Sequence, residues 1–179
     1  MKKIKFLQII ALCLTLSSCE SCEEKEWDTL PPETQIGANT FGCYVNGELF
    51  VKKKGEFGFM VSPPLSAYYD SNQVLSINCG GRDEMGEICL RVRNPVEGIK
   101  QATLWATLTK IVNTEDNKTY IVTYNMVANT GEIVLTKLDI VNRIVSGRFQ
   151  FQGRYSGTLG DSIVFVTNGR FDTKTFYIE

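Results

Sequence analysis

Short runs of β-branched and aromatic residues, each bounded by turn residues, recur along the chain from Phe41 to its end. Runs of this kind at intervals of about 8–12 residues are typical of an antiparallel sandwich or barrel. The predicted strands cover residues 41–45, 48–51, 56–61, 73–79, 87–93, 103–112, 119–127, 132–138, 145–152, 162–167 and 170–177. We therefore predict an all-β fold, an antiparallel two-sheet β-sandwich, with a small antiparallel β-barrel as the alternative.

Alternation of apolar and polar residues within three of these runs indicates which side chains face the core. Side chains alternate between the two faces of a strand, so every second residue shares a face. The predicted core-facing residues of these runs are Leu75, Ile77, Cys79, Ile88, Leu90, Val92, Phe149 and Phe151.

Two Asn-Gly pairs are candidate tight turns, because both residues accept the positive φ that a two-residue hairpin requires. Asn46-Gly47 separates the first two predicted strands, and Asn168-Gly169 separates the last two. Each pair is predicted to reverse the chain.

Residues 96–108 are the best candidate for a helix, because Ala102, Leu104, Trp105 and Leu108 would form an apolar stripe. The threonines among and after these residues favour a strand. In a strand, Trp105 falls on the threonine face, where it would contact either a ligand or a second core.

The first 18 residues have the pattern of a secretory signal peptide. Lys2, Lys3 and Lys5 precede an apolar run from Phe6 to Leu16. A basic start followed by about 7–15 apolar residues is typical of export signals, and the run is shorter than the ~20 residues of a spanning helix.

Leu16, Ser17, Ser18 and Cys19 resemble a bacterial lipobox, which is an aliphatic residue, two small residues and a cysteine. The resemblance implies that the Cys19 thiol is acylated, that cleavage precedes Cys19, and that the new amine is acylated as well. Two or more acyl chains give stable membrane attachment, so the lipid bilayer is a predicted partner.

Residues 19–38 lack periodicity, are acidic at first and contain Pro31 and Pro32, which predicts a flexible solvated tether. Residues 39–179 then form the single all-β domain. The acidic cluster 20–26, directly after the lipid-bearing cysteine, resembles the surface-export signal of Bacteroidetes lipoproteins.

Two short stretches resemble the Asp-Ser/Thr-aliphatic O-glycosylation site of Bacteroidetes. Thr29 lies in Asp28-Thr29-Leu30, on the predicted tether, and Ser162 lies in Asp161-Ser162-Ile163. We regard both as candidate modification sites.

Removal of Cys13 with the signal and acylation of Cys19 would leave Cys22, Cys43, Cys79 and Cys89. Export permits disulfides, and a glycine-rich loop separates the last two. Their strand alternation points the two thiols to opposite faces, so only a bulge would allow them to bond. Cys43 is expected to be a small buried apolar residue, and no cysteine spacing predicts zinc.

Composition narrows the function further. The 179 residues include 19 basic and 20 acidic side chains and no histidine. Removal of the signal changes the formal charge from -1 to -4, which argues against a nucleic-acid binder. Without histidine, Ser-His-Asp and Cys-His sites and histidine-ligated zinc are excluded. We assign no catalytic residue, metal or cofactor, and predict that the protein is not an enzyme.

Candidate partner-binding residues are Tyr68, Tyr69 and Trp105. The two tyrosines follow Pro63-Pro64 and precede Asp70, which predicts an exposed aromatic loop. Exposed aromatic rings beside a carboxylate suit a carbohydrate or a protein partner; the alternative is a loop that simply covers the core.

The stretch from Leu30 through Phe41-Gly42-Cys43 to Gly47 is similar to the opening of a family of uncharacterised Bacteroidetes lipoproteins, domain of unknown function 6252. The closing stretches 145–151 and 166–172 fit the same family, whereas residues 52–138 resemble it less. The resemblance implies a lipoprotein of a Gram-negative envelope and supplies no catalytic residue.

We therefore expect a lipoprotein anchored to the outer membrane of a Bacteroidetes cell, more on the surface than facing the periplasm. It would act as a non-enzymatic binding or accessory module for a glycan or an envelope protein. The alternative is a small-ligand carrier with Trp105 lining a barrel cavity. A glycan-acting enzyme is a third hypothesis, which two carboxylates in one cleft would favour.

Overall fold

The computed structural model describes residues 27–52, 65–81, 86–103, 105–115, 117–174 and 176–178. The predicted signal peptide, the lipobox with Cys19, Cys22 and the predicted strand 56–61 lie outside these residues.

The described residues form one hydrogen-bonded sheet of twelve strands. The strands are β1 (Thr40–Val45), β2 (Glu48–Val51), β3 (Leu65–Tyr69), β4 (Val74–Gly80), β5 (Glu87–Arg93), β6 (Lys100–Ala102), β7 (Trp105–Asn113), β8 (Thr119–Met126), β9 (Glu132–Asp139), β10 (Ile144–Tyr155), β11 (Ser162–Thr173) and β12 (Phe176–Ile178). Neighbouring strands are antiparallel except β12 and β3, which are parallel. The predicted all-β, antiparallel fold is confirmed.

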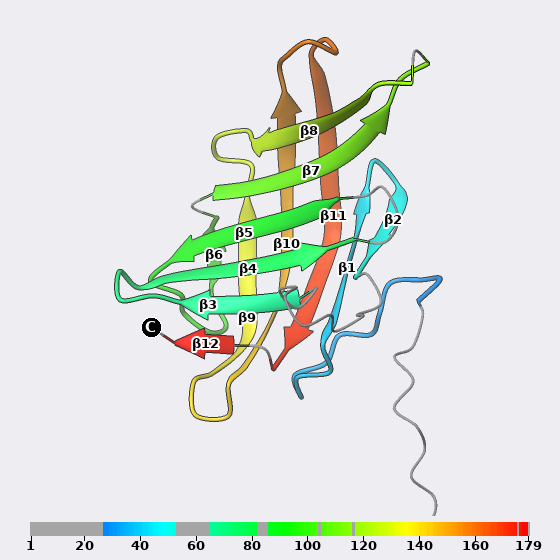
Figure 1. Cartoon of the computed structure of the whole chain (residues 1–179). Helices are drawn as coiled ribbons and strands as arrows, with labels where there is room; N and C mark the ends of the chain where they lie inside the picture. The colour runs from blue at the N-terminus through cyan, green and yellow to red at the C-terminus, as the bar shows by residue number, and fades with distance from the viewer. Residues whose placement is uncertain are drawn as a thin grey trace, which may run out of the picture.

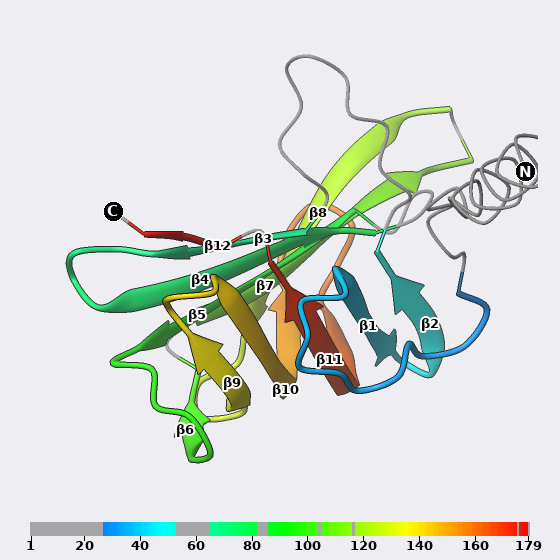
Figure 2. The ribbon, with the colours of Figure 1, turned by 90° about the horizontal axis from the view of Figure 1, so that it is seen from below.

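The sheet folds over into two layers whose strands cross steeply (Figures 1 and 2). We call the layer β12-β3-β4-β5-β7-β8 the front layer and the layer β2-β1-β11-β10-β9-β6 the back layer. The long strand β10 joins them, because it pairs with β9 along its first part and with β8 at Gly153 and Arg154. An isolated bridge between Lys52 and Gly81 also links the layers. The result is a sandwich with the partial closure of a barrel.

The predicted core faces are confirmed. Each of the eight residues expected to face inward is at most 4% exposed. Phe41 packs against Phe50 and Phe149, with ring centroids 5.9 and 5.1 Å apart, respectively. Burial of one such side chain contributes about 1.5–3 kcal/mol, and all three rings belong to the core between the layers.

The two Asn-Gly pairs have different structures. Asn46 and Gly47 have φ values of 51° and 85° and form the predicted turn between β1 and β2. Asn168 has a φ of 53° but lies inside the continuous strand β11, so the predicted turn at Asn168-Gly169 is wrong. The register against β1 and β10 shifts by one residue here, which identifies a β-bulge.

Two short strands were missed, and the helical alternative is not observed. β3 covers Leu65–Tyr69, where an exposed loop was predicted, and β6 covers Lys100–Ala102. Residues 96–108 form β6 and the start of β7 among the residues described there. The β-branched threonines therefore outweighed the apolar stripe.

Residues 27–39, which we call the N-terminal segment, lie against the outer side of β1 and β11 (Figure 2). Pro31 is buried, and its carbonyl accepts a hydrogen bond of 3.0 Å from Arg170. A Cβ on Gly42 would lie 2.7 Å from Pro31 Cδ, so only glycine permits this close approach. Residues 27–38 are therefore docked, in contrast to the flexible tether predicted for residues 19–38.

The Asp172 carboxylate, 1% exposed, holds this segment in place. It accepts hydrogen bonds from the Thr34 hydroxyl at 2.6 Å and from the amides of Ile36, Gly37 and Ala38 at 2.8–3.1 Å. From the strand side, the buried Ser146 hydroxyl donates a fifth bond of 2.7 Å. Burial raises the pKa of Asp172, but these hydrogen bonds outweigh burial and hold the pKa below its usual value.

Cys43, Cys79 and Cys89 are free thiols. Cys79 lies opposite Ile88, and Cys89 opposite Asn78, so their side chains point to opposite faces of the front layer as predicted. Cys43 and Cys79 are completely buried, which confirms the prediction for Cys43.

Candidate functional site

The strand register aligns five side chains in one row across the outer face of the front layer. Tyr177 of β12 lies opposite Tyr68 of β3, Tyr68 opposite Ser76 of β4, Ser76 opposite Arg91 of β5, and Arg91 opposite Trp105 of β7. We call this row the aromatic row. Residues beside these positions, such as Leu75, Leu90 and Ala106, point the other way into the core.

Each end of the aromatic row carries paired planar groups. Tyr68 and Tyr177 stack with ring centroids 5.0 Å apart and an interplanar angle of 21°. At the other end the Arg91 guanidinium lies over the Trp105 ring, 5.1 Å from its centroid. Cation–π contacts at exposed sites contribute about 0.5–1 kcal/mol. Both ends are therefore held in place before any partner binds.

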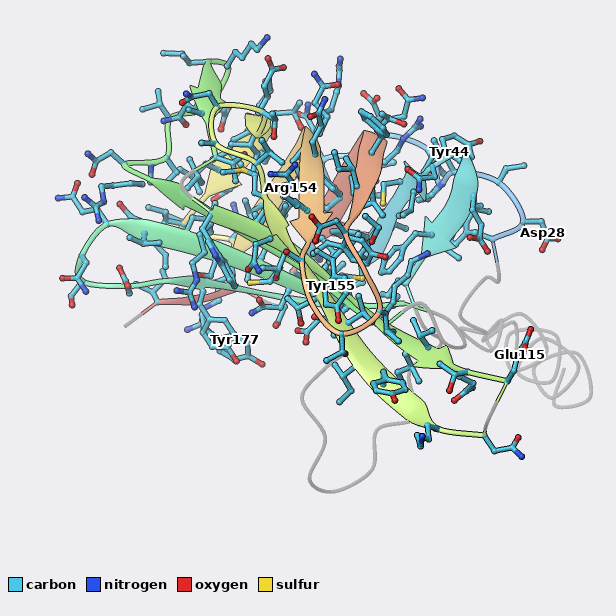
Figure 3. The ribbon with its side chains drawn as sticks, turned by 90° about the horizontal axis from the view of Figure 1, so that it is seen from above. Asp28, Tyr44, Glu115, Arg154, Tyr155 and Tyr177 are labelled. Atoms are coloured by element: carbon cyan, nitrogen blue, oxygen red, sulfur yellow. The ribbon has the colours of Figure 1, made fainter. Side chains whose placement is uncertain are left out.

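The rings of the aromatic row remain accessible. Trp105 is 39% exposed and Tyr177 is 42% exposed, and Figure 3 shows Tyr177 projecting away from the sheet. Between the two ends, the small side chain of Ser76 projects less from the sheet than the rings do. With strands about 4.8 Å apart, Tyr68 and Trp105 are separated by three strand steps, or about 14 Å. The row is thus a shallow, elongated platform.

The predicted exposed loop at Tyr68 and Tyr69 is wrong, because both residues lie in strand β3. Tyr68 and Tyr69 are neighbours in a strand, so Tyr68 belongs to the outer face and Tyr69 packs against the core. Asp70 is occupied by the following turn, because its carboxylate accepts hydrogen bonds from the amides of Asn72 and Val74, both at 2.9 Å. Of the predicted trio, Tyr68 and Trp105 share the row and Tyr69 does not.

Trp105 also bears on the carrier alternative. A carrier of the predicted kind needs Trp105 to line an interior cavity, but the side chain lies on the outer face with Arg91 over its ring. The strand pattern had placed Trp105 on the threonine face, and this placement is confirmed. The contribution of Arg91, Ser76 and Tyr177 was missed, because it depends on register between strands.

Cys89 lies next to the aromatic row, two residues before Arg91 on the same face of β5. Burial raises the pKa of the Cys89 thiol to about 11, although the positive charge of Arg91 and a hydrogen bond from it oppose this rise. Since the thiolate is the nucleophile, Cys89 is a weak one near neutral pH.

The predicted modification sites are both exposed. Thr29 lies in the N-terminal segment, and Ser162 lies at the first position of β11, where its hydroxyl is 3.4 Å from the Tyr124 hydroxyl. Both hydroxyl-bearing residues are therefore accessible at the surface.

Within the described ranges, no group of three cysteine, aspartate or glutamate side chains is arranged to hold a metal ion. No helix among those same residues is long and apolar enough to cross a membrane.

Comparisons with known proteins add no relative: no protein-family model, no curated protein and no solved structure matches this chain. The similarity to uncharacterised Bacteroidetes lipoproteins therefore stays a prediction.

Proposed function

We propose that this protein is a lipid-anchored, surface-facing outer-membrane protein of the Bacteroidetes type that binds an extended glycan chain on its aromatic row. It acts as a binding module and not as an enzyme. Acylated Cys19 attaches it to the bilayer, and residues 20–26 connect the anchor to the docked N-terminal segment.

The aromatic row is the single observation that carries this proposal. Aromatic rings have a large apolar face, which packs well against the C–H face of a sugar ring. The stacked tyrosines and Trp105 offer two such surfaces about 14 Å apart. Arg91 and Ser76 between them offer donors to sugar hydroxyls. This spacing suits several consecutive sugar rings better than a single one.

Prior ordering of the row favours binding. Side chains that are already stacked lose less conformational freedom when a ligand arrives, which saves about 0.5–1.5 kcal/mol for each ordered side chain. Tyr68–Tyr177 and Arg91–Trp105 are both ordered in this way.

The test is a panel of neutral oligosaccharides of increasing length, titrated into the full-length protein by calorimetry. Trp105→Ala and Tyr68→Ala are each expected to weaken binding about tenfold, equivalent to ~1.4 kcal/mol. Phe165→Ala is the matched control, because Phe165 is an aromatic residue 49% exposed on the back layer. Failure of every oligosaccharide to bind, or equal loss with Phe165→Ala, would contradict the proposal.

A further inference from the structure

A polar pocket of about 300 Å³ opens on the outer face of the back layer, away from the aromatic row. Three strands and the N-terminal segment build it. Its polar lining consists of Glu33, Glu132, Arg148, Gln150, Asn168 and Arg170. No motif in the sequence indicates this pocket, because its residues come together only through strand register and docking of the segment.

Two arginines lie side by side in this pocket. Arg148 of β10 is directly opposite Arg170 of β11, an arrangement that is unfavourable for like charges. Glu33 of the N-terminal segment pairs with Arg148 at 2.8 Å. Arg170 donates to the Pro31 carbonyl, and no carboxylate among the described residues forms a salt bridge with it. Its buried Nε has no hydrogen-bond partner.

The bulge in β11 is what brings Arg170 to this face. One extra residue at Asn168 reverses the alternation, so that Phe171 points into the core and Arg170 points outward. A regular strand would have turned Arg170 into the core. The bulge also leaves Asn168 exposed at the pocket wall.

On the other side of the pocket, Glu132 supplies hydrogen-bond acceptors. Glu132 is bound by Lys100 at 2.6 Å and by the Gln150 amide at 2.9 Å. The hydrogen bond from Lys100 and its positive charge keep the pKa of Glu132 below its usual value. Glu132 therefore stays ionised, which makes it an acceptor for hydroxyl groups and a poor general acid.

We propose that this polar pocket binds a sugar residue that carries one carboxylate, of the uronic acid type. Arginine pairs bind carboxylates with good geometry. Glu33 pairs with Arg148, and Glu132 pairs with Lys100 beside the pocket. The charge of Arg170 is then left for a monoanion. Glu132, Gln150 and Asn168 face the hydroxyls. A phosphate dianion is less favoured, because its second negative charge is repelled by Glu33 and Glu132 and finds no further cation.

This site is separate from the aromatic row in position and in chemistry. The volume lies at the lower end of the range for small-molecule pockets, which suits one monosaccharide. Because the two sites are on opposite outer faces, either proposal can fail without the other.

The test is an NMR titration of the full-length protein with glucuronate, glucose and inorganic phosphate. We expect glucuronate to shift backbone signals of β9, β10 and β11. It should bind about tenfold more tightly than glucose or phosphate, because only its carboxylate forms a charged hydrogen bond with arginine without excess negative charge. Raising the salt concentration should weaken glucuronate binding.

Three variants separate the pocket from general effects. Arg148→Gln should weaken glucuronate binding about tenfold, whereas Glu33→Gln should strengthen it, because Arg148 loses its internal carboxylate partner. Arg154→Gln is the matched control, since Arg154 is an exposed arginine on the same strand outside the pocket. A far-UV spectrum and an unfolding curve check that each variant folds.

Three results would overturn the proposal. The first is equal binding of glucuronate, glucose and phosphate, and the second is no binding of glucuronate at all. The third is full glucuronate affinity in a folded Arg148→Gln protein.

Discussion

Asp172→Ala is the substitution that most directly tests how the N-terminal segment is held. The change removes an acceptor that serves five donors, four from the N-terminal segment and one from the Ser146 hydroxyl. We expect the segment to leave the back layer while the two-layer sheet remains folded.

The expected loss of stability in Asp172→Ala depends on whether each hydrogen-bond donor can reach water in the variant. The four segment donors reach water once the segment is released, so they do not each cost a full hydrogen bond. Ser146 lies opposite Asp172 on the same outer face, so departure of the segment opens its hydroxyl to water as well. What is lost is the net contribution of hydrogen bonds to a charged acceptor, so the free energy of unfolding should fall by about 1.5–3 kcal/mol.

The pH dependence has a definite sign. The pKa of Asp172 is lowered in the folded state, so its contribution to stability is complete above the unfolded pKa of about 3.9. This contribution is lost as the pH falls through the folded pKa. The stability difference between wild type and Asp172→Asn should therefore be largest near neutrality and shrink in acid.

Two assays check the prediction. Urea unfolding gives the loss of stability, and hydrogen exchange measures the amides of Ile36, Gly37 and Ala38, which should exchange rapidly only in the variant. Asp161→Ala is the control, because Asp161 is exposed and accepts a hydrogen bond of 2.6 Å from the Ser156 hydroxyl. A loss below about 1 kcal/mol, with the three amides still protected, would show that Asp172 does not hold the segment.

Three further predictions concern the anchor, the back layer and the thiols. Cys19→Ala should abolish labelling by a fatty-acid analogue and release the protein from membranes; unchanged labelling would exclude lipidation at this residue. Gly147→Ala should destabilise the fold by about 1–3 kcal/mol in urea unfolding, because the new Cβ would lie 2.6 Å from the Val134 carbonyl oxygen and 2.8 Å from the Phe171 ring; wild-type stability would show that this contact relaxes freely. Cys89 should resist iodoacetamide at pH 7.5 and react faster as the pH approaches its pKa of about 11, as peptide mass spectrometry would show; rapid labelling at neutral pH would contradict the effect of burial.

The core faces were predictable because alternation is a local property of one strand. Leu75 and Ile77 on β4, and Leu90 on β5, could be assigned inward from their neighbours alone, and all are buried. The same logic separated the Cys79 and Cys89 thiols correctly.

The errors came where one local pattern fits two structures. Asn-Gly supplies positive φ both to a turn and to a bulge: Asn46-Gly47 uses it at both residues, whereas only Asn168 uses it in β11. β3 was missed because two prolines precede it and its tyrosines suggested a loop.

The candidate sites were the least predictable part. Tyr68 and Trp105 were singled out as aromatic residues, but their alignment through Ser76 and Arg91 depends on four pairings between strands. Docking of the N-terminal segment depends on backbone amides that leave no trace in residue type.

The fluorescence of Trp105 reports directly on whether the aromatic row binds a glycan chain. The chain has two tryptophans, so Trp27→Phe leaves Trp105 as the sole indole reporter. We predict a saturable change in its emission when a neutral oligosaccharide is added, with an affinity that Tyr68→Ala weakens about tenfold. An emission spectrum that stays constant across the oligosaccharide panel would contradict it.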